Sequence, residues 1–153
     1  MYTQDGSELT ILNSALIANT VQAGDASVGA VNLGMSGEAD EVTAINSVNL
    51  SARSTPTPTC GGWCGAASAG WDFSYTNTRD NAGSGYSIPD PTGEDGNLAV
   101  DPGFADTTSA DAAVWNLNLL STSPLIDAGD PSNLDPDCTR SDIGVYGGPA
   151  GSW

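Results

Sequence analysis

Histidine is absent from this chain of 153 residues, and only three basic residues stand against 19 acidic ones. The formal net charge at pH 7 is therefore −16. Such a charge repels phosphate backbones and anionic membrane surfaces, so we expect no nucleic-acid partner. Without histidine, neither a serine–histidine nor a cysteine–histidine nucleophile system can be assembled.

Long apolar runs are missing as well. No stretch of 18 apolar residues occurs, so we expect no segment to insert into a membrane. The chain opens with the polar and acidic sequence MYTQD, which is unlike an export signal.

Cysteine is scarce, with only Cys60, Cys64 and Cys138. An odd, small number of cysteines defines no disulfide framework. One pairing is a Cys60–Cys64 bridge that leaves Cys138 free, and the other joins Cys138 to either of them and ties a loop to the C-terminal region. A thiolate zinc site is disfavoured because no histidine completes a tetrahedral ligand set. We expect at least one disulfide and an oxidising compartment.

The residues that are present favour β-structure. Glycine occurs 19 times and proline 9 times, while charged residues make up only 14% of the chain. This composition is rich in turns, yet a hydrophobic content of 39% is too high for a disordered chain. The length suits a single domain with a buried core.

An internal repeat indicates how the β-structure is arranged. The stretch Thr10–Ala15, TILNSA, aligns with Thr43–Val48, TAINSV, at an offset of 33 residues. A unit of this kind cannot bury its own apolar face, so neighbouring units stack into a continuous core, as in a parallel β-helix. Asn13 and Asn46 are then expected at the same corner of successive coils, with their amides hydrogen-bonded along the stack. Sugar binding by these amides is the disfavoured alternative.

Further short strands follow the repeats. Alternation of apolar and polar residues predicts strands over Phe73–Asn77 and Val114–Leu120, and a short strand is expected at Leu98–Val100. Residues 51–70 break the pattern, because prolines in Ser54–Thr59 remove ladder donors. We expect residues 51–70 to be a loop insertion, with a tight glycine-rich loop from Cys60 onwards.

Three aromatic side chains near this insertion, Trp63, Trp71 and Tyr75, admit two interpretations. They form an exposed platform for a glycan, or they pack the loop onto the body of the domain. The second interpretation is favoured because large aromatic side chains mainly contribute buried area.

The densest acidic group near the C-terminus comprises Asp127, Asp130, Asp135, Asp137 and Asp142. Carboxylates on tight turns can converge on one point, and calcium takes roughly six to eight oxygen ligands, so we predict a Ca²⁺ site here. The spacing is not that of an EF-hand. In the competing interpretation, Arg140 forms a bidentate ion pair with Asp127 or Asp142 and fastens the segment to the last coil. Asp101 and Asp106 also suit the role of turn caps.

Three motifs follow one another in the last third of the chain: DPGFAD at 101–106, SPLIDAGD at 123–130 and DPDCTRSDIGVYGG at 135–148. In this order they resemble the C-terminal end of bacterial right-handed parallel β-helix surface proteins, a region called the choice-of-anchor domain (Q-type). The resemblance implies an export signal and more coils upstream, so we expect this chain to be a part or a processed form of a longer protein. Cys138 stands where the family pattern usually has glycine, which suggests a recruited disulfide partner.

These observations predict an all-β fold, a short right-handed parallel β-helix with a Pro/Asp-rich capping segment. About three coils are expected within residues 1–100, including the insertion at 51–70, and the capping segment within 101–153. We expect a non-catalytic structural or adhesive module of a secreted or bacterial cell-surface protein, stabilised by Ca²⁺.

Two other functions stay open. One is a carbohydrate-active module that binds polysaccharides or cleaves them as a lyase or glycoside hydrolase, although the scattered Arg53, Arg79 and Arg140 offer a lyase no focused cationic site. The other is a self-assembling filament subunit. A first coil with an unpaired edge would associate with upstream coils or with copies of the same chain.

Overall fold

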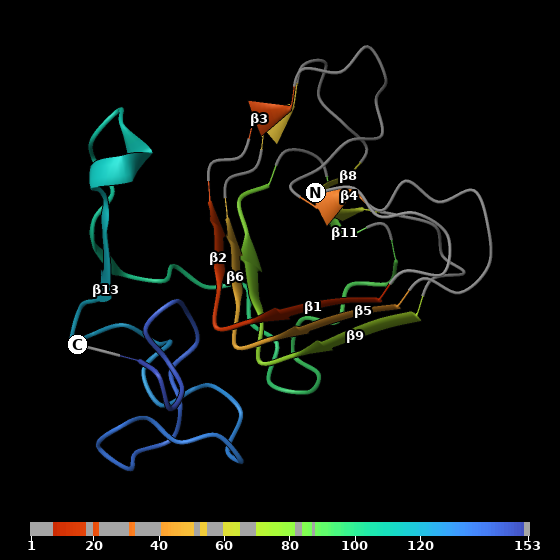
Figure 1. Cartoon of the computed structure of the whole chain (residues 1–153). Helices are drawn as coiled ribbons and strands as arrows, with labels where there is room; N and C mark the ends of the chain where they lie inside the picture. The colour runs from red at the N-terminus through yellow and green to blue at the C-terminus, as the bar shows by residue number, and fades with distance from the viewer. Residues whose placement is uncertain are drawn as a thin grey trace.

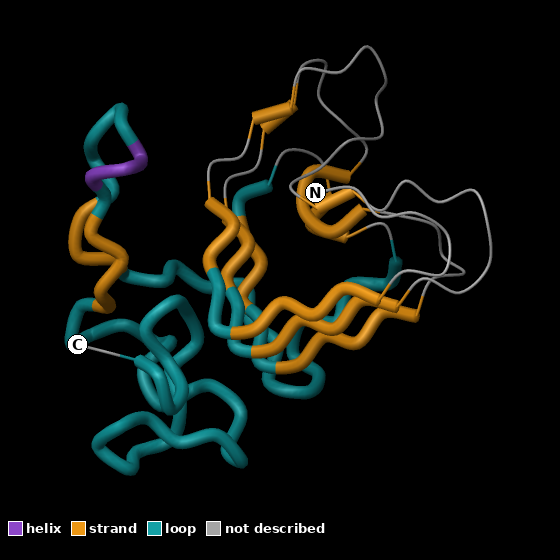
Figure 2. Tube along the Cα trace, in the orientation of Figure 1, coloured by secondary structure: helices purple, strands orange, loops and turns teal. Residues whose placement is uncertain are grey.

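The computed structural model describes residues 8–17, 20–21, 31–32, 41–50, 53–54, 60–64, 70–81, 84–86 and 88–151. Within these ranges the chain consists of short strands and turns, with a single 3-10 helix, η1 (Ala112–Val114) (Figures 1 and 2). None of the helical structure in the described ranges has the length and apolar character that a membrane crossing requires. The prediction of an all-β chain is confirmed.

The strands up to residue 86 fall into three repeats. The first repeat contains β1 (Glu8–Leu12), β2 (Ala15–Ile17), β3 (Thr20–Val21) and β4 (Val31–Asn32). The second contains β5 (Glu41–Ile45), β6 (Val48–Leu50), β7 (Arg53–Ser54) and β8 (Cys60–Cys64), and the third contains β9 (Gly70–Ser74), β10 (Asn77–Arg79) and β11 (Ser84–Tyr86).

Every strand in these repeats pairs in parallel with its counterpart in the next repeat. The sheets have the orders β1-β5-β9, β2-β6-β10, β4-β8-β11 and β3-β7, and Figure 1 shows the first two sheets meeting at a corner. Thr10 lies opposite Thr43 and Ala15 lies opposite Val48. The register predicted from the internal repeat is therefore confirmed.

The corner between the first two strands of each repeat requires a left-handed backbone. Asn13, Asn46 and Tyr75 occupy this corner with φ values of 42°, 51° and 51°. Asparagine tolerates this region better than most residues with a side chain. Asn13 and Asn46 thus lie at equivalent corners, as predicted.

The residue after each corner links one repeat to the next. The Ser47 hydroxyl lies 2.9 Å from the carbonyl oxygen of Ile45 and 3.4 Å from that of Ile11 in the preceding repeat. Its oxygen also accepts a hydrogen bond from the backbone N–H of Ser14, at 3.3 Å. In the third repeat, Thr76 donates in the same way to the carbonyl of Ala44, at 3.1 Å. We call the series Ser14, Ser47 and Thr76 the hydroxyl ladder.

The sheets β1-β5-β9 and β4-β8-β11 share an apolar core, to which β8 contributes the largest side chain. Trp63 is fully buried and donates its indole N–H to the Thr78 hydroxyl at 2.9 Å. Phe73 packs against the rings of Trp63, Trp71 and Tyr86, with centroids 5.1 to 5.5 Å apart. Burial raises the pKa of Tyr86 to about 12.

The position of β8 corrects one prediction. Cys60–Cys64 was expected to be a tight loop of an insertion, but it is the central strand of the sheet β4-β8-β11. Parallel neighbours on both sides supply its backbone partners, so the glycines in this stretch do not prevent a strand. Most of the remaining residues of the predicted insertion lie outside the described ranges.

The C-terminal part covers the outer face of the sheet β2-β6-β10. Strands β12 (Phe104–Asp106) and β13 (Asn116–Leu119) form an antiparallel pair, and irregular turns follow. Val48 of β6 points away from the interior and packs with Leu125 and Ile143, all three fully buried. This sheet is therefore buried on both faces.

A fully buried amide in β6 leads to a first prediction. Asn49 lies in register between Leu16 and Thr78, and neither its side-chain oxygen nor its nitrogen has a hydrogen-bond partner within the described structure. Burying an unpaired polar group costs about 1–3 kcal/mol. We expect Asn49→Leu, which has a similar volume, to raise the Tm by a few degrees in thermal denaturation followed by circular dichroism.

The matched control is Asn97→Leu, which removes a buried amide that bonds to Phe73 and Thr76, and which should lower the Tm. An Asn49→Leu protein that melts below the wild-type protein would contradict the prediction.

Candidate functional site

Residues 96–98 form a shortened fourth repeat at the end of the stack. Gly96 takes the corner position with a φ of 75°. Leu98 forms a parallel bridge with Asn77, and its N–H donates to the Thr76 carbonyl at 2.8 Å. Thr78 in turn donates to the Leu98 carbonyl at 3.0 Å. The chain therefore covers the outer edge of β10 in the third repeat.

Asn97 ends the hydroxyl ladder. Its side-chain N–H donates to the Phe73 carbonyl at 2.7 Å, and its side-chain oxygen accepts from the Thr76 N–H at 3.0 Å. Between the first and second repeats, the equivalent two groups are the Ile11 carbonyl and the Ser14 N–H, and both bond to the Ser47 hydroxyl. Because Asn97 is only 1% exposed, both bonds are shielded from water. One amide thus satisfies both groups that the third repeat leaves unpaired at this point.

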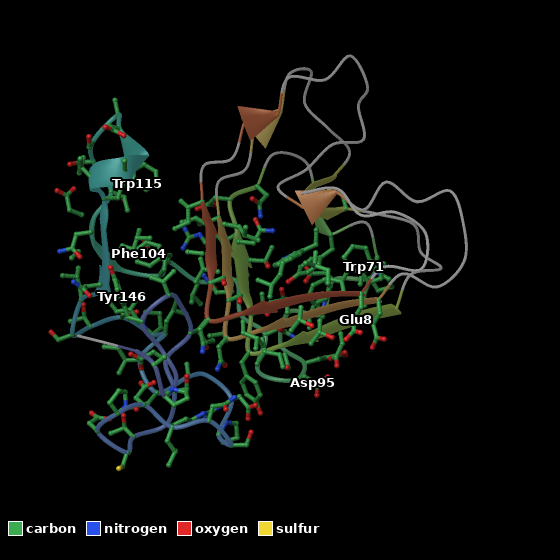
Figure 3. All side chains as sticks on the ribbon, in the orientation of Figure 1. Glu8, Trp71, Asp95, Phe104, Trp115 and Tyr146 are labelled. Atoms are coloured by element: carbon green, nitrogen blue, oxygen red, sulfur yellow. The ribbon has the colours of Figure 1, made fainter. Side chains whose placement is uncertain are left out.

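A second amide fixes the chain that follows. Asn77 donates to the Val100 carbonyl at 3.0 Å and accepts from the Val100 N–H at 2.9 Å. Asn77 is fully buried. Tyr75 adds a bond from its N–H to the Asp95 carbonyl, at 3.0 Å, and Figure 3 labels Asp95 at this end of the stack. Residues 95–100 are therefore held to the third repeat by backbone and amide bonds; we call them the closing strand.

The segment from Ser123 to Gly148 docks onto the corners of the repeats, with Asn46 at its centre. The Asn46 side-chain oxygen accepts from the Asp130 N–H at 2.7 Å, its side-chain N–H donates to the Ser141 hydroxyl at 3.2 Å, and its carbonyl accepts from Gly144 at 3.0 Å. The expected amide ladder between Asn13 and Asn46 is wrong, because the C-terminal segment uses the Asn46 amide. We call residues 123–148 the docking segment.

Glycines in this part of the chain make room for the corner side chains. A Cβ atom at Gly129 would lie 2.6 Å from the Ser141 carbonyl oxygen and 2.7 Å from the Asn46 side-chain oxygen. A Cβ atom at Gly148 would collide with the Asn13 side chain. Gly129 of the SPLIDAGD motif and Gly148 of the YGG motif are thus explained by close packing against the repeats.

Arg140 has a structural role that differs from the predicted one. Its guanidinium donates to the carbonyls of Gly129 and Ala128, and it lies 5.3 Å from the centre of the Tyr75 ring. Among the described residues it forms no ion pair, so the predicted pairing with Asp127 or Asp142 is wrong. Backbone carbonyls and an aromatic face receive the charge instead.

The three candidate aromatic residues do not form a platform. Trp63 lies in the interior, and Trp71 stacks on Phe73 with centroids 5.5 Å apart. Tyr75 lies at the corner beneath Arg140. The packing interpretation is confirmed for Trp63 and Trp71, and the glycan platform is wrong.

Most of the predicted metal ligands accept backbone hydrogen bonds. Asp135 accepts from the N–H groups of Asp142 and Gly148, and Asp142 accepts from the Asp127 N–H at 2.7 Å. Both acids are almost fully buried. Asp130 and Asp137 accept from the residues two positions later, Ser132 at 2.8 Å and Thr139 at 3.0 Å.

The same turn-capping role applies to Asp101 and Asp106, which accept from Gly103 and Thr108, each at 2.9 Å, as predicted. Hydrogen bonds from Thr139 and Thr108 lower the pKa of Asp137 and Asp106 below the usual range. The acidic side chains thus organise the turns of a segment that has little regular secondary structure.

Four of the five predicted acids line one open groove of about 570 Å³. Leu119, Ile126 and Pro136 form its apolar wall. Its acidic residues are Asp127, Asp135, Asp137 and Asp142. Within the described ranges, no three acidic or cysteine side chains are grouped closely enough to hold a metal ion. Among the described residues, none donates a hydrogen bond to the Asp127 carboxylate, and the bonds to Asp137 and Asp142 from other residues each use one carboxylate oxygen.

The cysteines separate into two environments. Cys138 is a free, exposed thiol with a φ of 70°, so the alternative in which it ties an insertion to the acidic segment is wrong. Cys64 is buried and disulfide-bonded. The side chain of Cys60 lies outside the described ranges.

Sequence reasoning missed Asn97 and Asn77, which hold the closing strand. The signal for Asn97 is a continuation of the Asn-Ser pair at 13–14 and 46–47: a left-handed residue followed by a hydrogen-bonding residue recurs as Tyr75-Thr76 and Gly96-Asn97. The residue identities change at each step, so only the geometry reveals the pattern.

Comparison of the chain with protein-family models, with curated proteins and with solved structures found no match.

The buried Asp142 leads to a prediction about pH. Burial is the main cause that raises its pKa to about 6, opposed by the bond from the Asp127 N–H, while the charges of Asp135, Asp127 and Asp137 raise it further. Between about pH 4 and 6 the folded chain keeps a proton that the unfolded chain has lost. The contribution of Asp142 to stability therefore falls as pH rises through this window.

Asn at this position keeps an acceptor for Asp127 and removes the charge. We expect Asp142→Asn to raise the free energy of unfolding at pH 7.5, on the order of 1–2 kcal/mol, and to have little effect at pH 4. Urea titrations between pH 4 and 8 measure the difference. A gain that does not change with pH would contradict the assignment.

The docking contact at Gly129 leads to a second prediction for this site. We expect Gly129→Ala to lower the free energy of unfolding by about 1–3 kcal/mol, because the new methyl group overpacks the contact with Asn46 and Ser141. Hydrogen exchange should show faster exchange of the Asp130 and Gly144 amides, which bond to Asn46.

The control is Gly93→Ala, where a Cβ atom would meet nothing within 4 Å and only the φ of 91° is unfavourable. It should cost about 1 kcal/mol and leave both amides protected. Equal loss of protection in the two variants would contradict docking through Gly129.

Proposed function

We propose that this chain is the C-terminal part of an extracellular right-handed parallel β-helix, and that its role is structural rather than catalytic. In this proposal the three repeats are coils of a solenoid, and residues 95–151 close it. Parallel sheets in register and a shared apolar interior support the solenoid. Solenoids need a closed end because a coil without a neighbour exposes an unpaired sheet edge.

The observation that carries the proposal is the buried amide of Asn97. It makes both hydrogen bonds that a further repeat would make through its hydroxyl, without adding another full strand. The strand that would extend the sheet β1-β5-β9 beyond β9 is replaced by a turn that reaches from Pro91 to Asn97. A chain segment built in this way ends a stack rather than continuing it.

The docking segment supports the same role. Its side chains are used for internal turns and for contact with the corners, and this use is typical of a structural element. An extracellular, bacterial surface location accords with the family that the motifs resemble. Calcium as a stabiliser belongs to the proposal too, through the carboxylates of Asp127, Asp137 and Asp142, which line the groove.

A second candidate function is favoured by the acidic groove. A carbohydrate-active module needs two carboxylates beside a sugar, one of them protonated near neutral pH. Asp142 has a pKa raised to about 6 and lies in the same groove as Asp127, Asp135 and Asp137. A neutral or calcium-bridged polysaccharide would be the substrate class, since the net charge of −16 repels anionic glycans.

One set of measurements tests the proposed function. We expect the Tm in millimolar Ca²⁺ to exceed that in EGTA by a few degrees, corresponding to about 1 kcal/mol of linked binding. We expect no reducing sugar to be released from neutral polysaccharides and no binding on a glycan array under either condition.

Release of reducing sugar that Asp142→Asn abolishes would overturn the structural role in favour of the carbohydrate-active one. An unchanged Tm would remove calcium from the proposal and leave the N–H donors as the groups that compensate the acids. A Ser132→Ala variant, which alters a turn outside the groove, serves as the matched control in both assays.

A further inference from the structure

The two ends of the stack differ. At the third repeat, residues 95–100 bond to the corner and to β10, whereas β1 and β2 have no partner on their outer side among the described residues, either at the corner or along the strands. A groove of about 470 Å³ runs along this edge. It is lined by Leu9, Thr10, Ile11, Leu12, Ser14 and Leu16.

Several residues of the first repeat are more exposed than the second-repeat residues in register with them. Thr10 is exposed where Thr43 is half-buried, and Ser14 is half-buried where Ser47 is fully buried. Leu12 is 54% exposed, a high value for a leucine within a strand. The second-repeat positions lie between two repeats, whereas those of the first repeat have a described neighbour on one side only.

The hydroxyl ladder indicates which kind of structure would cover the first repeat. The Ser47 hydroxyl accepts a hydrogen bond from the Ser14 N–H and lies within hydrogen-bond distance of the Ile11 carbonyl. Both groups belong to the preceding repeat. Ser14, at the equivalent position, donates only to its own Leu12 carbonyl, at 2.7 Å, and its oxygen accepts no bond in the described structure. Its free lone pair matches the N–H that follows a left-handed corner.

We propose that this edge docks a preceding repeat of the same kind, carried by the same polypeptide, and that Ser14 recognises it. The preceding repeat would supply a parallel strand, a left-handed corner, an N–H for the Ser14 oxygen and a carbonyl for the Ser14 hydroxyl. This inference rests on the proposed solenoid and adds the residue that selects the partner and the register in which it binds.

A second copy of this chain does not meet these requirements. At its third repeat, Asn97 already bonds to the Phe73 carbonyl and the Thr76 N–H, and Leu98 already pairs with β10, so a second copy cannot continue the hydroxyl ladder there. Two first repeats that face each other would pair β1 with β1 in antiparallel. Such a pair leaves the Ser14 oxygen without the N–H that a parallel repeat provides.

The experiment extends the full chain by one repeat. A copy of residues 8–40 is inserted between Ser7 and Glu8, so that the original β1 becomes an internal strand. We expect the Tm of the extended chain to rise by several degrees, and the amides of the original β1 to gain hydrogen-exchange protection comparable to that of β5.

Ser14→Ala provides the specific readout. In the parent chain it should change the Tm little, because Ser14 bonds only within its own turn. In the extended chain, the same substitution in the internal copy should lower the Tm by about 2–4 °C more than in the parent chain, since it removes bonds between repeats. Equal effects in the two chains would overturn the proposal.

A second extension, with a copy of residues 41–69 in the same place, guards against an insert that fails to fold. Loss of cooperative unfolding with both inserts would overturn the proposal. Dimerisation of the parent chain through β1, seen by light scattering and lost in the extended chain, would also overturn it and assign the edge to a second copy. None of these outcomes depends on the polysaccharide assays. A failure of the docking proposal can therefore be distinguished from a failure of the proposed structural function.

Discussion

The fold depends on the corner at which each repeat changes direction. A left-handed residue there turns the chain between two strands, and the neighbouring carbonyls then need donors that a regular sheet does not supply. The hydroxyl of Ser47 or Thr76 supplies the donor and reaches into the preceding repeat. Because an unpaired buried carbonyl costs about 1–3 kcal/mol, the position after the corner fixes the register of the stack. The apolar interior then fills behind it.

The repeat register could be predicted from the sequence because two repeats share the pair Asn-Ser at the corner. The third and fourth repeats could not, because Tyr75-Thr76 and Gly96-Asn97 keep the geometry and change the residues. β8 was missed for another reason. Its glycines indicate a loop, and only the strands β4 and β11, distant in sequence, make an extended conformation favourable.

The role of the acidic residues could not be predicted from residue types alone. Turns that place aspartates close together serve either to gather oxygens around a cation or to cap backbone N–H groups, and both uses need the same residues. Asp130, Asp135 and Asp137 all accept N–H bonds. The partners of Arg140 could not be predicted either, because they are backbone carbonyls and the Tyr75 ring, which the pattern of charges in the sequence does not identify.

The docking segment touches a corner in every one of the three repeats: Gly148 lies against Asn13, Gly129 against Asn46, and Arg140 against Tyr75. In a simple solenoid each unit senses only its neighbours, so the ends can fray while the middle stays folded. A brace that runs across all three units removes that freedom. Loosening any one corner also loosens the segment that secures the other two, so this short stack should open and close as a single cooperative body.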